Sequence, residues 1–111
     1  MATTKIDEGE WHRYFDTVGS ALQGRKATVQ VIGPDIGAQF AAEDLGIIGI
    51  TYDQKDQLLE IALDGLDHLI RHPREIYIDE TSDGAAMIEV VDADEHKHII
   101  QIRPKSSMPQ S

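Results

Sequence analysis

From residue 26 to residue 102 the chain is a succession of short segments in which apolar and polar residues alternate. Alternation with a period of two is typical of β-strands that bury one face. Seven such segments are predicted: residues 26–32, 38–43, 47–52, 58–63, 75–79, 85–91 and 96–102. Most of the connections between them are only a few residues long, whereas a parallel crossover needs a dozen or more. The chain is therefore expected to form a mainly antiparallel sheet.

A helix is predicted ahead of these strands. Four apolar residues recur at every third or fourth position and form one stripe: Trp11, Phe15, Val18 and Leu22. This spacing is that of one helical face. Asp7 and Glu10 have the spacing of a capping box at its start, and Gly24 provides a stop at its end. The stripe is expected to cover the apolar face of the sheet.

The expected fold class is α+β, with the N-terminal helix packed on a bent, mainly antiparallel sheet or partly open barrel of six to seven short strands. Residues 65–71 are expected to form one or two helical turns between two of the strands. A single domain is predicted over residues 5–103, and residues 1–4 and 104–111 are predicted to be flexible termini.

The charge balance excludes several kinds of partner. Asp and Glu number 20 against 10 Lys and Arg, so the net charge is -10. A chain with this charge is expected to bind nucleic acid and anionic lipid poorly. In addition, no apolar run approaches the roughly 18 residues that span a bilayer. The chain has no cysteine, which excludes disulfides and thiolate sites. Without a leader-like N-terminus, the expected location is cytoplasmic. No cofactor is expected.

The segment 65–74 is the richest in chemically active side chains, and five of its residues are candidates for ligand binding: Asp67, His68, Arg71, His72 and Arg74. On a helix, His68 and His72 would share one face with Asp67, as in a two-histidine, one-carboxylate metal site. Pro73 pushes His72 toward an extended backbone instead, which favours a surface turn.

The same segment contains a basic group within an acidic chain, formed by Arg71, His72 and Arg74. Guanidinium groups bind carboxylates and phosphates in a bidentate way, so an anionic ligand is one interpretation. The other is that these side chains pair with neighbouring acids such as Glu75, as mixed surface charges commonly do.

A second group of candidates surrounds the turn at residues 92–95. His96 and His98 are two residues apart on a predicted strand and hence share a face. A four-residue loop would place Glu89 opposite His98, as an acid/base dyad or, together with His96, as a metal site. The alternatives are a solvated polar face, or a partly buried His98 beside Ile100.

Residues 49–77, with the sequence from Gly49-Ile-Thr-Tyr to Arg74-Glu-Ile-Tyr77, resemble a family of small bacterial proteins catalogued only as a domain of unknown function. The helix region around Trp11 and Phe15 is similar to the N-terminus of that family, so the likeness covers most of residues 4–103. The resemblance implies a cytoplasmic bacterial protein, and it carries no activity, cofactor or catalytic residue.

These observations favour a non-catalytic binding or interaction module whose partner is an unidentified protein or small molecule. Since no complete catalytic constellation is present, the sequence does not indicate an enzyme. Self-association as a homodimer is expected, because exposed sheet edges have to be protected. The alternatives are a metal-binding protein that uses His96, His98 and Glu89, and a small acid/base enzyme that uses Glu89 with His98 or Asp67 with His68.

Overall fold

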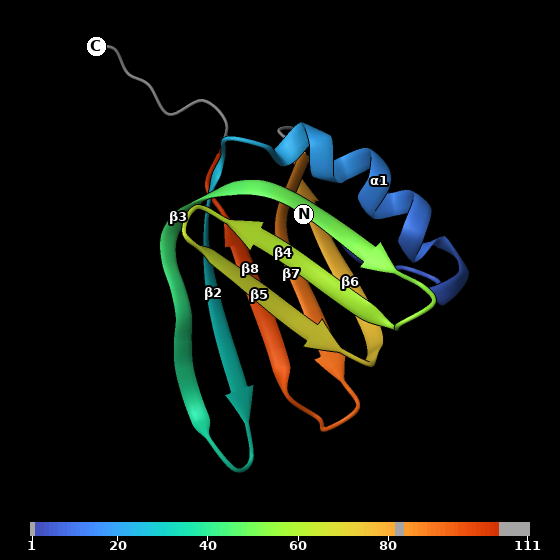
Figure 1. Ribbon diagram of the computed structural model, residues 1–111, viewed down its shortest axis with the longest axis vertical. Helices are drawn as coiled ribbons and strands as arrows, with labels where there is room; N and C mark the ends of the chain where they lie inside the picture. The colour runs from blue at the N-terminus through green and yellow to red at the C-terminus, as the bar shows by residue number, and fades with distance from the viewer. Residues whose placement is uncertain (1, 82–83, 105–111) are drawn as a thin grey trace.

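A computed structural model describes residues 2–81 and 84–104. Within them lie a 3-10 turn, η1 (Glu8–Glu10), and one α-helix, α1 (Trp11–Leu22). Eight strands make up the rest: β1 (Ala2–Lys5), β2 (Lys26–Gly33), β3 (Gly37–Asp53), β4 (Leu58–Leu63), β5 (Leu66–Arg71), β6 (Pro73–Thr81), β7 (Gly84–Asp92) and β8 (Lys97–Ile102). They form one antiparallel sheet in the order β1-β6-β7-β8-β2-β3-β4-β5 (Figure 1).

The sheet bends along β3, which is 17 residues long and pairs with two different strands. Its first part pairs with β2 as far as Gly46, and its second part pairs with β4 from Ile47 onward. Asp44 lies at the junction with a positive φ of 57°, and the register with β2 shifts nearby. Such irregularities bend a strand and increase its twist. As a result, β4 and β5 lie in front of β7 and β8 (Figure 1), and the sheet is not closed into a barrel.

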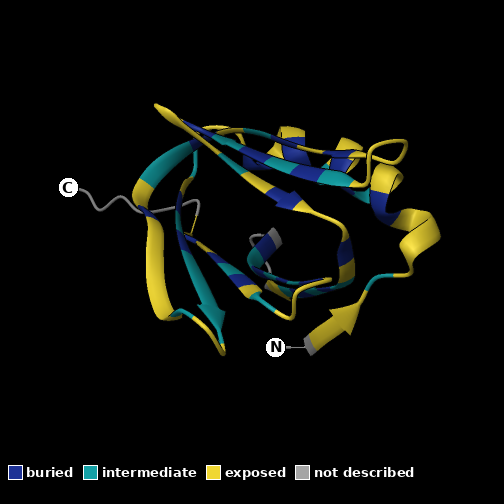
Figure 2. Ribbon diagram, turned by 60° about the horizontal axis from the view of Figure 1, so that its bottom comes forward, coloured by how far each residue is buried: buried dark blue, intermediate teal, exposed yellow. Residues whose placement is uncertain are grey.

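The helix packs its apolar stripe against the second part of β3. Trp11, Phe15 and Leu22 are each only 1% exposed. The Trp11 ring meets Tyr52 edge to face at 5.2 Å, and its indole N–H donates to the carbonyl of Ile6 at 3.0 Å. In Figure 2, buried residues alternate with more exposed ones along the strands and along α1. No helix among the described residues is long and apolar enough to cross a membrane.

The predicted helix is confirmed, but its predicted capping box is wrong. The Asp7 side chain makes no capping hydrogen bond, and its backbone carbonyl accepts the Glu10 N–H at 2.8 Å. This bond closes the 3-10 turn, so the α-helix begins only at Trp11. Gly24 follows the helix with a φ of 87°, a left-handed conformation that ends helices readily.

The α+β class is confirmed, whereas the expected number of strands is wrong. Two predicted strands, 38–43 and 47–52, are parts of the single strand β3, and two further strands bring the described total to eight. Residues 65–71 form β5 instead of helical turns, because Gly65 (φ 85°) lets a two-residue turn reverse the chain directly after β4.

The other additional strand is β1, which pairs with β6. Residues 2–4 therefore belong to the sheet, although the sequence placed them in a flexible terminus. The sequence Ala2-Thr3-Thr4 shows no alternation of apolar and polar residues, so only the backbone pairing reveals the strand. Of the expected flexible tail 104–111, residues 105–111 lie outside the described part of the chain.

We expect Gly19→Ala to destabilise the protein, although alanine normally favours a helix. A methyl group at residue 19 would lie 2.8 Å from the backbone oxygen of Ile50, so α1 would have to move away from β3. Overpacking of this kind costs about 1–3 kcal/mol, which urea denaturation would measure. Gly9→Ala is the control, because nothing lies within 4 Å of its new methyl group. Equal stability of the two variants would contradict the close packing of α1 on β3.

Candidate functional site

The turn between β7 and β8 determines where the two candidate histidines point. One carboxylate oxygen of Asp92 accepts the backbone N–H groups of Asp94 (2.9 Å) and His96 (3.0 Å), and Glu95 adopts a φ of 66°. A turn followed by a left-handed residue is a common three-residue hairpin loop, and it shifts the register by one. Val90 therefore lies opposite His98, and Glu89 lies opposite Ile99.

The expected cross-strand pair of Glu89 and His98 is accordingly wrong. Neighbouring residues on a strand point to opposite faces, and Val90 shares a face with His98, so Glu89 lies on the other face of the same layer. Its carboxylate lies 3.9 Å from the Lys97 ammonium group. His98 instead points inward beside Ile100, in agreement with the alternative of a partly buried histidine, and is 6% exposed.

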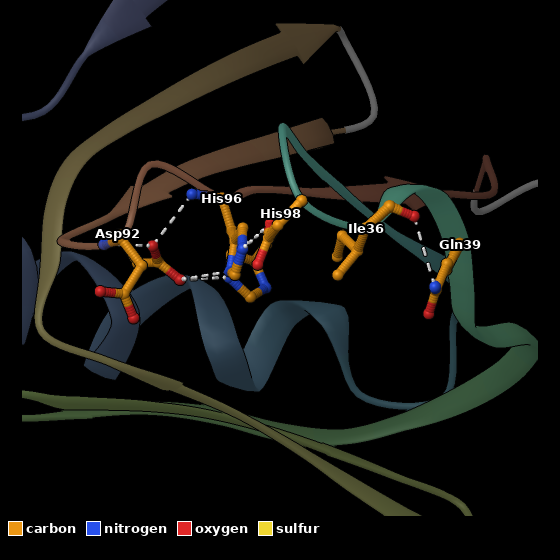
Figure 3. A network of polar contacts seen from close by, with 7 residues as sticks. Ile36, Gln39, Asp92, His96 and His98 are labelled. Carbon is orange, nitrogen blue, oxygen red and sulfur yellow. Dashed lines mark hydrogen bonds and ion pairs between the residues drawn. The ribbon is translucent and has the colours of Figure 1, made fainter.

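His98 is held between two polar partners. Its Nε2 lies 2.9 Å from the second carboxylate oxygen of Asp92, and its Nδ1 lies 2.9 Å from Nε2 of His68 on β5. Figure 3 shows the Asp92 carboxylate between the loop backbone and the His98 ring. The carboxylate can only accept a hydrogen bond, so His98 donates its Nε2–H to Asp92, and we assign the proton between the two rings to Nε2 of His68. This Asp92–His98–His68 chain joins the back layer to the front layer.

The surroundings of His68 in this hydrogen-bonded series keep its ring neutral. Burial and the adjacent His98 ring lower the pKa of His68 from 6.5 to about 4. Burial alone would raise the pKa of Asp92, but hydrogen bonds from His98 and from the N–H groups of His96 and Asp94 bring it below its ordinary value. With so low a pKa, His68 is a poor proton acceptor near neutral pH. This hydrogen-bonded series is therefore better suited to holding the two layers together than to acting as a general base.

His96 takes part in a separate contact, between two turns. Its Nε2 lies 2.8 Å from a carboxylate oxygen of Asp35, in the turn that joins β2 to β3. The hydrogen bond with Asp35 raises the pKa of His96, and the same bond lowers the pKa of Asp35. A methyl group on Gly33 would collide with the His96 ring, so a glycine is required beneath it.

The five candidates in the segment 65–74 do not converge on one point. On β5, His68 faces the interior, whereas Asp67 and Arg71 lie on the exposed face. The proposed dyad of Asp67 with His68 is therefore not formed. His72 adopts a φ of 54°, and its Nδ1 lies 3.0 Å from the side-chain oxygen of Gln57.

Arg74 is turned outward by a β-bulge. Pro73 pairs with Asp92 and Glu75 pairs with Val91, so Arg74 has no residue opposite it. A regular strand would place Arg74 on the same face as the buried Ile76. Within the described residues, Arg74 forms no ion pair or hydrogen bond, and the expected pairing with Glu75 is absent: Glu75 contacts Lys5 and Tyr77 instead.

A surface pocket of about 360 Å³ lies beside this bulge. We call it the Arg74 pocket, and five residues line it: Arg74, Glu75, Val91, Glu95 and Lys97. Three of them, Glu75, Val91 and Lys97, are cross-strand neighbours on adjacent strands. The pocket thus combines two cationic side chains with two carboxylates at the end of the β6–β7–β8 layer.

Two other hollows are less suited to recognising a charged ligand. One, about 410 Å³, is an open cleft between the N-terminal segment and α1, with Tyr14 and Ile6 in its wall. This cleft also contains Arg13 and Lys5. Its Arg13 pairs with Glu10 at 3.5 Å, and its Lys5 lies 3.9 Å from Glu75. The third, about 180 Å³, is a shallow groove between α1 and β3. Both cationic side chains of the first cleft thus have an acidic neighbour, whereas Arg74 has none among the described residues.

The geometry does not support the metal site expected from His96, His98 and Glu89. His98 points inward, Glu89 points to the opposite face, and His96 binds Asp35. In residues 2–81 and 84–104, no group of three or more histidine or acidic side chains is arranged to hold a metal ion.

Sequence reasoning missed the partners that complete these contacts: Asp92, Asp35 and Lys97. Asp92 could have been found, because an Asp followed by turn residues commonly accepts the N–H groups two and four residues ahead. Asp35 lies 61 residues from its partner His96, and no local pattern connects two turns so far apart.

The fold and the site define a small α+β protein in which one helix covers a bent antiparallel sheet. The chain belongs to the DUF5335 family, a family of unknown function whose sequence model matches residues 2–111. It is 36% identical over 111 residues to an uncharacterized protein of Aquifex aeolicus (strain VF5), and the match covers 99% of this chain and 100% of the relative. No solved structure matches the chain. The family membership expected from residues 49–77 is confirmed.

The stability of the protein should decrease as the pH is lowered from 6.5 toward 4. His68 stays neutral in the folded protein down to about pH 4, whereas in the unfolded chain it is protonated below about 6.5. The unfolded state therefore binds more protons in this window, and its free energy falls relative to that of the folded state. After allowance for solvent screening of the half-buried ring, we expect a loss of about 1–2 kcal/mol by urea denaturation.

His68→Gln should flatten this pH dependence, whereas His12→Gln, on the exposed face of α1, should leave it as in the wild type. The raised pKa of His96 does not interfere, because its contribution changes only above pH 6.5. A stability that stays constant between pH 6.5 and 4 in the wild type would contradict the burial of a neutral His68.

Asp92→Asn should reverse the tautomer of His98. Two backbone N–H groups in the loop require the amide oxygen, so the amide NH₂ would face His98 Nε2. The ring proton would then move to Nδ1, which long-range ¹H–¹⁵N NMR detects directly. Loss of the charge-assisted bonds should also destabilise the protein by about 1–3 kcal/mol. Retention of the proton on Nε2 would contradict the proposed hydrogen-bond order.

Proposed function

We propose that the protein is a non-catalytic binding module of the bacterial cytoplasm that recognises a carboxylate or phosphate group in the Arg74 pocket. The observation that carries this proposal is the bulge at Arg74, which turns an otherwise unpaired guanidinium group toward a pocket shared with Lys97. Bulges commonly redirect a side chain at a binding site.

Arg74 differs from several other cationic side chains because it has no acidic partner among the described residues. Acidic residues outnumber basic ones by 20 to 10. Among the described residues, four cationic side chains lie within ion-pair distance of an acid: Lys5, Arg13, Lys97 and Arg103. Arg13 and Arg103 are paired with Glu10 and Asp44. Arg74 lacks such a partner among the described residues, and its fork of N–H donors is available for bidentate contact with an oxyanion. Lys97 is held only by a 3.9 Å contact with Glu89.

The carboxylates of Glu75 and Glu95 in the same pocket restrict the class of ligand. They repel a multiply charged anion and accept hydrogen bonds, so they favour a ligand that carries one anionic group next to a hydrogen-bond donor. The net charge of -10 opposes anion binding at long range, but this field is screened within about 8–10 Å at physiological salt. Local donors therefore decide recognition.

An NMR titration of the full chain tests this function, with succinate and inorganic phosphate as separate probes. We expect saturable shifts of the backbone amides of Glu75, Val91, Glu95 and Lys97 with at least one probe. Arg74→Gln should weaken this binding about tenfold, the effect of losing one charge-assisted hydrogen bond.

Arg13→Gln provides the matched control, because it removes an exposed arginine from α1 and should leave the affinity unchanged. Two results would overturn the proposal: no saturable shift with either probe, or an equal loss of affinity in both variants. The first result would show that the Arg74 pocket does not bind these anions. The second would show that binding depends on the overall charge of the protein and not on Arg74.

A further inference from the structure

β5 is an edge strand with one side of its backbone unpaired. It lies at the end of the strand order, paired only with β4, and forms the outermost strand of the front layer in Figure 1. Leu69 and Leu66 on this strand are 43% and 39% exposed. A strand edge that also exposes apolar side chains is a template for pairing with another strand.

The backbone ladder identifies which residues present the free groups. The N–H of His72 donates to the carbonyl of Gln57 at 2.8 Å, one step beyond the pair of Arg71 with Leu58. Hydrogen-bonded pairs recur at every second residue of an antiparallel ladder. His68 and Ile70 therefore bond to β4, and three residues direct their N–H and C=O groups to the free edge: Asp67, Leu69 and Arg71.

The side chains of these three residues share the exposed face of β5. Read along the strand, they are an acid, a leucine and a base. An antiparallel second copy with Leu69 opposite Leu69 places each Asp67 opposite Arg71 of the other copy. In this register, every residue whose N–H and C=O groups point to the free edge lies opposite another such residue of the second copy. Hydrogen-bonded pairs between the two strands require this arrangement. A two-fold axis through Leu69 thus makes the strand complementary to itself in hydrogen bonds, charge and apolar contact.

We propose that β5 is the interface of a homodimer, in which the β5 strands of two copies pair antiparallel about Leu69 and join the two sheets into one. The proposal is independent of the Arg74 pocket. Asp67 and Arg71 make no ion pair or hydrogen bond within the described residues, so both are available to the second copy. The other edge of the sheet, β1, is only four residues long and carries Thr3, Thr4 and Lys5, which makes it a poorer template.

Two charge variants test the register. Asp67→Arg leaves two basic residues on the edge, and Arg71→Asp leaves two acidic ones. Since like charges lie opposite each other in either homodimer, each variant should self-associate at least tenfold more weakly than the wild type. An equimolar mixture of the two should regain association, because each introduced residue then meets an opposite charge. The substitutions are on the exposed face of β5, so the fold should be retained, as circular dichroism would verify.

Sedimentation equilibrium of the full chain, from micromolar to millimolar concentration, provides the measurement. The expected result is a wild-type monomer–dimer equilibrium, weaker dimers for each variant alone and a heterodimer in the mixture. Glu43→Arg is the control, because it makes a similar charge change at an exposed residue of β3 and should leave the dimer intact.

Three outcomes would overturn the proposal. A wild-type chain that remains monomeric throughout excludes the dimer. A dimer that neither variant weakens places the interface elsewhere. Association that continues beyond the dimer indicates head-to-tail pairing of β5 with β1, since pairing unlike edges does not close.

Discussion

The arrangement of the molecule depends on the length and bend of β3. A strand of 17 residues is long enough to pair with β2 at one end and with β4 at the other. The irregular backbone at Asp44 turns the strand between these pairings, so the sheet folds back over itself. α1 then covers the second part of β3, and the closeness of Gly19 to Ile50 shows how tightly the two elements pack. Without this bend, β5 and β8 would lie at distant places in a flat sheet.

The fold-back brings together the polar contacts at the centre of the candidate site. Among the described residues, Asp92 and His98 are the buried polar ones, and both are satisfied within the Asp92–His98–His68 chain. A buried polar group without a partner costs more than an apolar one, so the chain stabilises the native pairing of layers and disfavours slipped ones. The two histidines thus join the layers, and among the described residues they form no group of three or more histidine or acidic side chains arranged for a metal ion.

Two exposed features remain after the buried residues are explained, and they lie on different parts of the surface. The Arg74 pocket is formed by a bulge at the end of the back layer, and the free edge of β5 belongs to the front layer. Each of them contains an arginine that forms no ion pair among the described residues. Arg74 lies at the bulge, and Arg71 lies on the unpaired edge. The proposed ligand is assigned to the first of these locations and the proposed second copy to the other, because a guanidinium group binds carboxylates and phosphates well.

Residue patterns determined α1, the antiparallel pairing and most of the strands, because these depend on neighbours within a few residues. Trp11, Phe15 and Leu22 had to share a helical face, and Leu59, Ile61 and Leu63 had to share a strand face. The charge balance and the absence of cysteine also followed directly from the chain. Membership in a family of unknown function was also expected from the sequence, and the family model matches residues 2–111.

Tertiary structure alone decided which side chains meet. The pairing of His98 with Asp92 instead of Glu89 resulted from one left-handed residue, Glu95, which shifted the register by one position. His68 meets His98 across 30 residues, because β3 bends and carries β5 over β8. His96 meets Asp35 across 61 residues, because β2 pairs with β8 and the turns beside these strands come together. A bend angle and a loop conformation arise from the packing of the whole chain, so alternation and spacing could predict the elements but not the contacts between them.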